Sequence, residues 1–180
     1  MYKVINIFID DLTDQQKAEV LQLQLGCFSD VPSQEIEEDF FTTPLSRVLA
    51  YEQDQLVGCA GTRKRKISYE GQTISLGGIS GVCTRSDRRG KGIATQVCTT
   101  AMQFLTELGC DVVFLSTSPM ARRLYEKLGF QPLEQGFSWE NIHGQVKVGA
   151  NGMLASLGSP AVAEAILRGQ SVFHVGPGYW

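Results

Sequence analysis

The segment that most constrains the fold is a glycine- and arginine-rich loop that joins an apolar strand to a long amphipathic helix. It reads Arg-Ser-Asp-Arg-Arg-Gly-Lys-Gly over residues 85–92, between a predicted strand at 72–84 and a predicted helix from Ile93. A loop that leads into a helix presents unpaired backbone N–H groups and the positive end of the helix dipole to an anion. Gly90 and Gly92 let the backbone approach a ligand, because they carry no side chain. The segment therefore predicts a binding site for a phosphorylated cofactor.

Positive side chains around the two glycines support the same expectation. Arg88, Arg89 and Lys91 place mobile positive charge at this point of the chain. Two familiar phosphate-binding loops are excluded. A P-loop requires Ser or Thr after Gly-Lys, and here Gly92 follows Lys91. A dinucleotide-binding loop requires Gly or Ala where this chain has Thr95, and an acidic residue at the end of the next strand.

Two strings of residues carry a resemblance to a known family. The first is Arg89-Gly90-Lys91-Gly92-Ile93-Ala94, and the second is Ala-Arg-Arg-Leu-Tyr-Glu-Lys-Leu-Gly-Phe over residues 121–130. The first resembles the pyrophosphate loop of the GNAT superfamily of N-acetyltransferases. The second resembles a short helix of that family, which ends in Tyr-x-x-x-Gly-Phe. The resemblance is most specific over residues 45–137, and it implies a GNAT-like α/β fold with a mixed, mostly antiparallel central sheet flanked by helices.

Composition fits a single globular domain over residues 1–180. The chain is 43% hydrophobic and 19% charged, and its net charge of −3 gives no general attraction to nucleic acid or to an anionic membrane. No apolar run reaches the ~20 residues of a membrane span, and the N-terminus lacks the features of a signal peptide. We therefore expect a cytoplasmic protein with no nucleic-acid or membrane partner. The sequence leaves open whether it forms a homodimer.

The five cysteines are odd in number and lack the spacing of metal ligands, so we expect neither a metal site nor a disulfide framework. They are expected to be small buried side chains in a reducing compartment. Cys83 invites the hypothesis of a nucleophile that carries an acetyl group. No histidine partner is evident for it, which favours a structural role. His143 and His174 are each expected to be solitary.

Hydrophobic periodicity and turn residues predict the other elements. Thr13 and Gln16 match a capping box at the start of one helix, and Ser118 is expected to cap a later helix that ends at Gly129. Strands are expected at residues 4–9, 47–52, 55–67, 72–84, 112–116, 130–139 and 146–157, and further helices start at Ser33, Ile93 and Ala161.

A basic run at residues 63–66, Arg-Lys-Arg-Lys, has the composition of a nucleic-acid-binding or targeting patch. On a strand, however, successive side chains point to opposite faces, so the run cannot form a continuous patch. A solvated strand edge that flanks the acidic end of the cofactor is the expected structure.

The resemblance implies positions for acetyl-CoA, the expected co-substrate. Pantetheine would pair with the backbone of Val82, Cys83 and Thr84, with an amide near Val82 as the oxyanion donor. The pyrophosphate would lie on backbone amides from Arg89 to Ala94. Tyr125 matches the family tyrosine that reaches the cofactor sulfur. A phenol with an ordinary pKa of about 10 is protonated at neutral pH, so Tyr125 is expected to act as the general acid.

The acceptor side is less determined. Ser80 stands where many relatives carry a glutamate that activates the amine, and serine cannot do this alone. Glu38, Asp39, the terminal carboxylate and direct attack by a neutral amine all remain open. The residues expected to bind a small-molecule amine are Asp30, Ser80, Gly81, Ser116 and Trp180.

A narrower resemblance, to the aminoglycoside 2′-N-acetyltransferases, rests on residues 79–82, residues 115–125 and a chain that ends on Trp180. It implies that the carboxylate of Trp180 helps to hold a polycationic sugar. After Glu164, however, the chain has no Asp or Glu, although a polycation requires several carboxylates around it. Three hypotheses therefore stand beside a general amine acetyltransferase: an aminoglycoside acetyltransferase, a non-catalytic acyl-CoA sensor, and a protein-modifying acetyltransferase.

Overall fold

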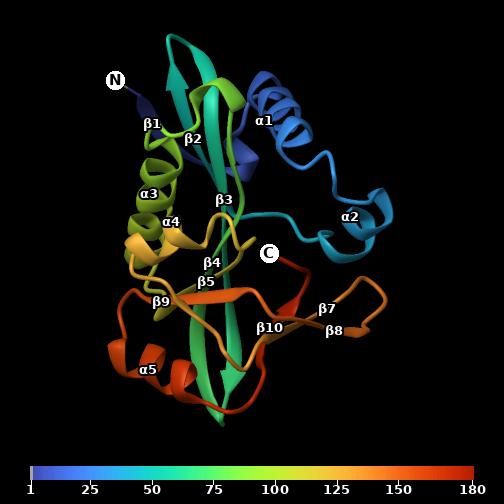
Figure 1. Cartoon of the computed structure of the whole chain (residues 1–180), viewed down its shortest axis with the longest axis vertical. Coiled ribbons are helices and arrows are strands. Elements are labelled where there is room, and N and C mark those ends of the chain that lie inside the picture. The colour runs from blue at the N-terminus through green and yellow to red at the C-terminus, as the bar shows by residue number, and fades with distance from the viewer. Residues whose placement is uncertain (1) are drawn as a thin grey trace.

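Two β-sheets form the framework of the protein. The computed structural model describes the backbone of residues 2–180 and every side chain in this range except those of Ser33 and Glu35. The large sheet has the strand order β1-β2-β3-β4-β5-β9-β6, and the small sheet has the order β10-β7-β8 (Figure 1). The strands are β1 (Lys3–Phe8), β2 (Ser46–Glu52), β3 (Gln55–Tyr69), β4 (Gln72–Thr84), β5 (Val112–Ser116), β6 (Gln131–Pro132), β7 (Phe137–Glu140), β8 (Val146–Gly149), β9 (Gly152–Ser156) and β10 (Phe173–Pro177).

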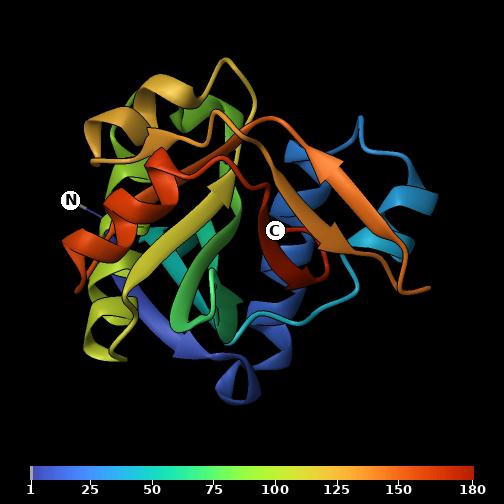
Figure 2. The same cartoon turned by 90° about the horizontal axis from the view of Figure 1, so that it is seen from below.

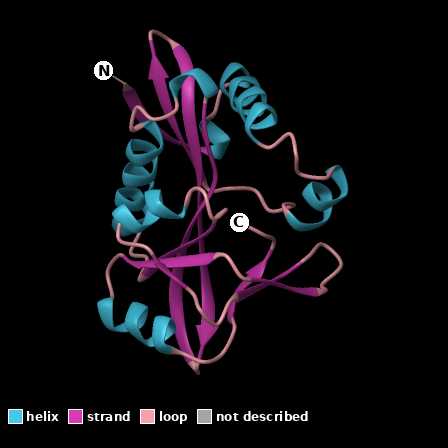
Figure 3. Cartoon of the chain, viewed as in Figure 1, coloured by secondary structure: helices cyan, strands magenta, loops and turns pink. Residues whose placement is uncertain are grey.

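Helices flank both faces of the large sheet. They are α1 (Asp14–Cys27), α2 (Ser33–Asp39), α3 (Ile93–Glu107), α4 (Arg122–Lys127) and α5 (Pro160–Arg168). α3 and α4 lie on one face and α1 and α2 on the other (Figure 1 and Figure 2). Figure 3 shows the long strands β3 and β4 running along the molecule between these helices. Within the large sheet only β4 and β5 pair in parallel, so the expected mixed, mostly antiparallel sheet is confirmed.

Each face of the sheet has its own core. On the α3 face, Val97, Ala101 and Leu105 of the helix are fully buried in one cluster with side chains of β2 and β3. On the α1 face, Val20 is buried in a separate cluster with Leu49 and other side chains of the sheet. These apolar stripes recur at helical spacing along the sequence, which is why the helices and their buried faces are predictable. None of the helices in the described part of the chain is both long and apolar enough to cross a membrane.

Several local predictions are confirmed. The Thr13 hydroxyl accepts a hydrogen bond from the Gln16 amide, and the Gln16 side chain accepts one from the Thr13 amide, as a capping box requires. The strands expected at 47–52, 55–67 and 72–84 form as β2, β3 and β4, within two residues of the expected bounds. Gly109 follows α3 with φ of 72°, in the left-handed region that ends many helices.

The predictions for residues 130–157 are partly wrong. The expected strand 130–139 is two strands, β6 and β7, that belong to different sheets. A turn separates them, in which the Gly136 amide donates to the Leu133 carbonyl and Gly136 has φ of 74°. The expected strand 146–157 is likewise divided into β8 and β9. Turn residues mark both breaks, Gly136 in the first and Asn151-Gly152 in the second, and these were the signals that could have separated the strands. β10 (Phe173–Pro177) was not predicted.

Two smaller predictions are also wrong. Ser118 does not cap α4, because the helix starts at Arg122 and the Ser118 carbonyl instead accepts a bond from Ala121 in a preceding turn. The basic run does form a strand edge, because residues 63–66 pair with β4 but lie beyond the pairing with β2, which ends at Thr62; the expectation is wrong in that this edge is only partly solvated. Its two lysines, Lys64 and Lys66, are exposed, whereas Arg63 is buried and Arg65 is half-buried.

The C-terminal residue packs against the centre of the sheet. Trp180 is 3% exposed, and its ring lies 5.9 Å from the ring of Phe114. The indole also covers Gly78 of β4 so closely that a Cβ there would overlap Trp180 Cε3. The absence of a side chain at Gly78 is thus a condition for this packing.

A valine at Gly78 should therefore destabilise the protein. Overpacking of this kind costs about 1–3 kcal/mol, because the indole and the strand must move apart. Thermal unfolding of Gly78→Val should show Tm lowered by several degrees. Gly26→Val in α1 is the matched control, since nothing lies within 4 Å of a Cβ there. A Gly78→Val protein as stable as Gly26→Val would contradict the packing of Trp180.

Candidate active site

β4 and β5 separate at the centre of the large sheet. They pair at three positions only, Leu76 with Val112, Gly77 with Val113 and Gly78 with Phe114. From residue 79 onward no residue of β5 pairs with β4, whereas the opposite edge of β4 remains paired with β3 up to Thr84. Backbone N–H and C=O groups on the open side of residues 79–84 are therefore available to another molecule, as at the edge of a sheet.

A β-bulge shapes the same segment of β4. Cys59 pairs with Cys83 and Gly61 with Ser80, so the single residue between them on β3 opposes two residues on β4. Gly81 takes up the distortion with φ of 57°. A Cβ on Gly81 would lie 2.6 Å from Gln24 of α1, whereas Val82 packs against the core beside α3. The bulge thus redirects the side chains of β4 immediately beside the opening.

The glycine-rich loop follows β4 and leads into α3. Gly90 and Gly92 both have φ of 77°, and nothing lies within 4 Å of a Cβ at either position. No side chain caps the N-terminus of α3 within the described residues, so its first amides have no side-chain acceptor. A cavity of about 360 Å³ opens at this point. It is lined by Thr84, Arg88, Arg89, Gly90, Gly92, Ile93, Ala94, Thr95 and Leu124.

These residues fit the pyrophosphate and pantetheine of an acyl-CoA. The uncapped amides and the helix dipole suit an anion. The Thr84 hydroxyl is buried and has no hydrogen-bond partner in the described structure, although buried hydroxyl groups normally have one. It lies where β4 ends and the cavity begins, so a ligand amide or hydroxyl is a suitable partner.

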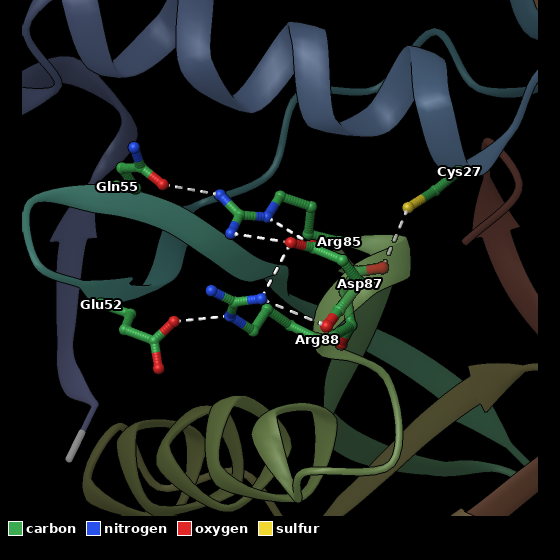
Figure 4. A network of polar contacts seen from close by, with 7 residues as sticks. Cys27, Glu52, Gln55, Arg85, Asp87 and Arg88 are labelled. Carbon is green, nitrogen blue, oxygen red and sulfur yellow. Dashed lines mark hydrogen bonds and ion pairs between the residues drawn. The ribbon is translucent and has the colours of Figure 1, made fainter.

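Arg88 is held within a network of ion pairs, contrary to the expectation of mobile charge (Figure 4). Its guanidinium lies 2.5 Å from Glu52 and 2.8 Å from Asp87, and Asp87 also pairs with Arg85 at 2.7 Å. Hydrogen bonds from Arg85 and from Arg88 lower the pKa values of the Asp87 and Glu52 carboxyls, respectively. The network therefore fixes the start of the loop.

The other two basic residues of the loop differ from Arg88. Arg89 and Lys91 are exposed, and neither forms an ion pair with a described residue. Their charges therefore stay available to an anion at the cavity, as the sequence predicted.

Tyr125 lies on α4, beyond the opening between the strands. It is 6% exposed, and its ring meets the edge of Phe130 at 5.9 Å between centroids. Its hydroxyl has no hydrogen-bond partner among the described residues, so it is not the internally bonded core tyrosine that the sequence also allowed. Burial raises its pKa above the ordinary value, with smaller contributions from Cys98 and Cys83. The phenol is therefore neutral at physiological pH.

The structure favours a structural role for Cys83. Its side chain is buried opposite Cys59 on the neighbouring strand. The hydrogen bond with Cys59 and burial both raise the pKa of the Cys83 thiol, which keeps it protonated and poorly nucleophilic. Cys27 is half-buried, unlike the other four cysteines, and its thiol lies 3.7 Å from the Thr84 carbonyl.

His174 is not solitary, contrary to expectation. Its Nδ1 lies 3.0 Å from the Ser138 hydroxyl, and its Nε2 lies 3.4 Å from a Glu140 oxygen. These contacts join β10 to β7 within the small sheet. His174 therefore has a structural role in the small sheet, away from the residues of the glycine-rich loop.

The expected acceptor residues fall into different surroundings. Ser80 lies at the bulge, and its hydroxyl accepts a 3.2 Å hydrogen bond from Arg63. Ser116 ends β5 and is hydrogen-bonded to the Tyr179 hydroxyl. The Trp180 side chain is in the core, and within the described structure no ion pair involves the terminal carboxylate. Asp30 is exposed on the segment after α1 and hydrogen-bonds with Ser29.

Two candidate general bases, Asp39 and Glu38, accept hydrogen bonds from other side chains of the protein. The Asp39 carboxylate is buried and accepts a 3.0 Å hydrogen bond from the Trp139 indole. Glu38 accepts a 2.8 Å bond from Gln34 within the same helix. Both carboxylates thus have roles in supporting the fold around α2.

Sequence reasoning missed Arg47, which lies at the bulge. Its guanidinium is 3.0 Å from the position of a Cβ on Gly61 and 3.4 Å from that of a Cβ on Gly81. A regular hairpin with a two-residue turn between the expected strands 47–52 and 55–67 would pair Arg47 with Ala60. The structure has a bulge between Ala50 and Tyr51, which shifts the partner of Arg47 to Gly61, so the sequence did not signal this position. The site thus combines an anion-binding loop, an open strand edge, a neutral phenol and an arginine, a set suited to acyl transfer from a phosphorylated thioester.

Known proteins share this fold. A family model described as acetyltransferase (GNAT) domain matches residues 9–133. The fold is similar to that of Escherichia coli ElaA, with a TM-score of 0.63, 21% identity, and coverage of 87% of this chain and 100% of that chain. An acyl-CoA N-acyltransferase from Pseudomonas aeruginosa gives a TM-score of 0.64, with the same identity and coverage. The NatC complex bound to Gag peptide and CoA gives 0.57 at 17% identity, covering 86% of this chain and 99% of that chain. Since the family match spans more than half of its length, the chain belongs to the GNAT acetyltransferase family and is an acyltransferase.

Proposed function

We propose that the protein transfers an acetyl group from acetyl-CoA to the primary amine of a small molecule, by direct attack in a ternary complex. The observation that carries this proposal is the opening between β4 and β5. It lies directly before the loop with Gly90 and Gly92 and beside the neutral phenol of Tyr125. The similar NatC structure, whose complex contains CoA, supports a CoA thioester as the donor.

The chain's own groups divide the work of binding. Amides from Arg89 to Ala94, at the uncapped start of α3, would hold the pyrophosphate, with Lys91 adding charge. The open backbone of Val82, Cys83 and Thr84 would pair with the pantetheine amides. Acetyl-CoA would supply the activated acyl group as a thioester.

Three features would promote the transfer itself. The Val82 amide, which follows the bulge at Gly81 on the segment of β4 unpaired with β5, would stabilise the negative charge that develops on the acyl oxygen. Tyr125 would give a proton to the departing thiolate. Ser80 is uncharged, and its hydroxyl already accepts a hydrogen bond from Arg63. We therefore propose that the amine attacks in its neutral form, without a carboxylate base. We also propose that the protein is a single domain in the cytoplasm. Its free cysteines support a reducing compartment.

Acetyl-CoA-dependent thiol release over an amine library tests the function. We expect release that depends on both substrates and becomes faster as pH rises, because the acceptor amine must lose its proton to attack. A second candidate, a non-catalytic acyl-CoA sensor, is favoured by one observation, the serine in place of a carboxylate at residue 80. Thermal stabilisation by acetyl-CoA without thiol release from any amine would identify the sensor and reject the transferase.

A further inference from the structure

Three arginines lie on one face of the sheet beside the bulge. Arg47 belongs to β2, and Arg63 and Arg65 belong to β3. They share the face of α1 and α2, because Arg47 is paired with Gly61, and residues 61, 63 and 65 alternate to the same side of β3. Burial, together with the positive charges of Arg65 and Arg47, lowers the pKa of Arg63 to about 10. The three guanidiniums thus form one interacting group.

Arg65 has a structural role. Its guanidinium donates hydrogen bonds of 2.8 Å to the Val175 carbonyl and 2.7 Å to the Pro177 carbonyl. Its Cζ lies 4.3 Å from the centroid of the Trp180 ring, in a cation–π arrangement. These contacts hold β10 and the C-terminal residue against β3, so joining these segments is the role of Arg65.

Arg63 and Arg47 are not held by such contacts with backbone carbonyls or an aromatic ring of the described residues. Arg63 is 8% exposed and donates to two neutral hydroxyls, Ser80 at 3.2 Å and Thr42 at 2.5 Å. The half-buried Arg47 side chain extends across Gly61 to the bulge at Gly81, where neither glycine has a Cβ to obstruct it. No carboxylate among the described side chains lies within ion-pair distance of either guanidinium. Two neighbouring cations are therefore withdrawn from water without a counter-charge, which is costly unless an anion joins them.

We propose that the acceptor is a primary amine that also carries an anionic group, a carboxylate or a phosphate, and that Arg47 and Arg63 bind this group. The inference rests on the proposed acetyl transfer, and it names the class of acceptor. The cofactor cavity beside α3 contains none of the three arginines, and they lie on the opposite face of the sheet. Since β4 and β5 are unpaired beside Val82, an amine whose anionic group is bound by Arg47 would reach the donor through this opening.

The same charges oppose a polycationic acceptor. An aminoglycoside amine that approached the bulge would meet two guanidiniums without an intervening carboxylate. This is the reverse of the acidic surroundings that such a sugar requires. An amine with a terminal carboxylate or phosphate instead supplies the missing counter-charge, and a guanidinium can bind either group through paired hydrogen bonds.

Calorimetric binding to the full chain in the presence of CoA tests the proposal without relying on turnover. The probes are 4-aminobutyrate, its carboxamide and 1,4-diaminobutane, with the analogous sets built on β-alanine and phosphoethanolamine. We expect the anionic member of at least one set to bind about 10-fold to 100-fold more tightly than its neutral or cationic counterpart, as one charge-assisted hydrogen bond provides. Equal or tighter binding of the neutral and cationic members in every set would overturn the proposal.

Variants test whether Arg47 is responsible for the preference for anionic amines. Arg47→Gln should abolish it without changing affinity for acetyl-CoA, and Arg47→Lys, which keeps the charge, should retain part of it. Lys66→Gln removes the same charge from the exposed side of β3 and should leave the preference intact. A preference that survives Arg47→Gln would refute the assignment. If Arg47→Gln does not fold, the wild-type comparison and Arg47→Lys still decide the matter. Thiol release is recorded separately, so a lack of acetyl transfer would count against the proposed function alone.

Discussion

Replacing Tyr125 with phenylalanine should lower kcat by about 10²–10⁴-fold, the usual contribution of a positioned general acid. The substitution removes only the hydroxyl, and that hydroxyl has no partner among the described residues whose loss would disturb the fold. The ring contact with Phe130 is retained. The KM for acetyl-CoA should therefore change little, because the cofactor loop is untouched. Steady-state thiol release over a range of both substrates measures the two parameters.

The pH dependence of the same reaction has a definite sign. An acid must be protonated to act, and burial raises the pKa of Tyr125, so its proton is retained throughout the ordinary range for tyrosine and beyond. No loss of kcat from this group is therefore expected below pH about 10. An unchanged kcat in Tyr125→Phe, with the variant folded by thermal unfolding, would eliminate the acid role and leave Tyr125 as a packing residue.

Placing valine at Gly92 should weaken acetyl-CoA binding by about 10–100-fold, equivalent to about 1.4–2.8 kcal/mol. Gly92 has φ of 77° and ψ of 6°, and a β-branched residue is strained in this left-handed region by about 1–3 kcal/mol. The loop would relieve the strain by rotating the amides at the start of α3 away from the pyrophosphate. Calorimetric titration with acetyl-CoA measures the change in Kd.

Gly71 offers a matched control for this substitution. It has φ of 80°, and nothing lies within 4 Å of its Cβ position, as at Gly92, but it belongs to the turn between β3 and β4. Gly71→Val should cost similar stability and leave the affinity for acetyl-CoA unchanged. Equal loss of affinity in the two variants would mean that backbone strain acts globally, and the assignment of the phosphate site to this loop would fail.

The part of the site formed by adjacent residues was predictable from the sequence. The loop from Arg89 to Ala94, the strand before it and the helix after it are continuous in the chain, and the forces that shape them are local. Gly90 and Gly92 adopt positive φ as such a loop requires. The capping box at Thr13 was predictable for the same reason, because both of its hydrogen bonds span three residues.

Features that depend on distant residues were not predictable in the same way. β7 pairs with β10, whose residues come more than thirty positions later, so no local pattern could show that β6 and β7 belong to different sheets. The ion pair between Arg88 and Glu52 joins the loop after β4 to the end of β2. Because Glu52 is distant in the sequence, the composition of the loop suggested that the charge of Arg88 is free, whereas the structure pairs it. Arg47 became relevant only through its register with Gly61 and the bulge at Gly81.

The central claim, acyl transfer at the opening between β4 and β5, is tested most directly by following a labelled acetyl group. Protein, acetyl-CoA with an isotopically labelled acetyl group, and the panel of anionic, neutral and cationic amines are incubated, and the products are identified by mass spectrometry. We predict label on the nitrogen of an anion-bearing amine with the wild-type protein, and a loss of at least about 100-fold in the rate with Tyr125→Phe. Tight binding of acetyl-CoA with no label in any amine would contradict the claim.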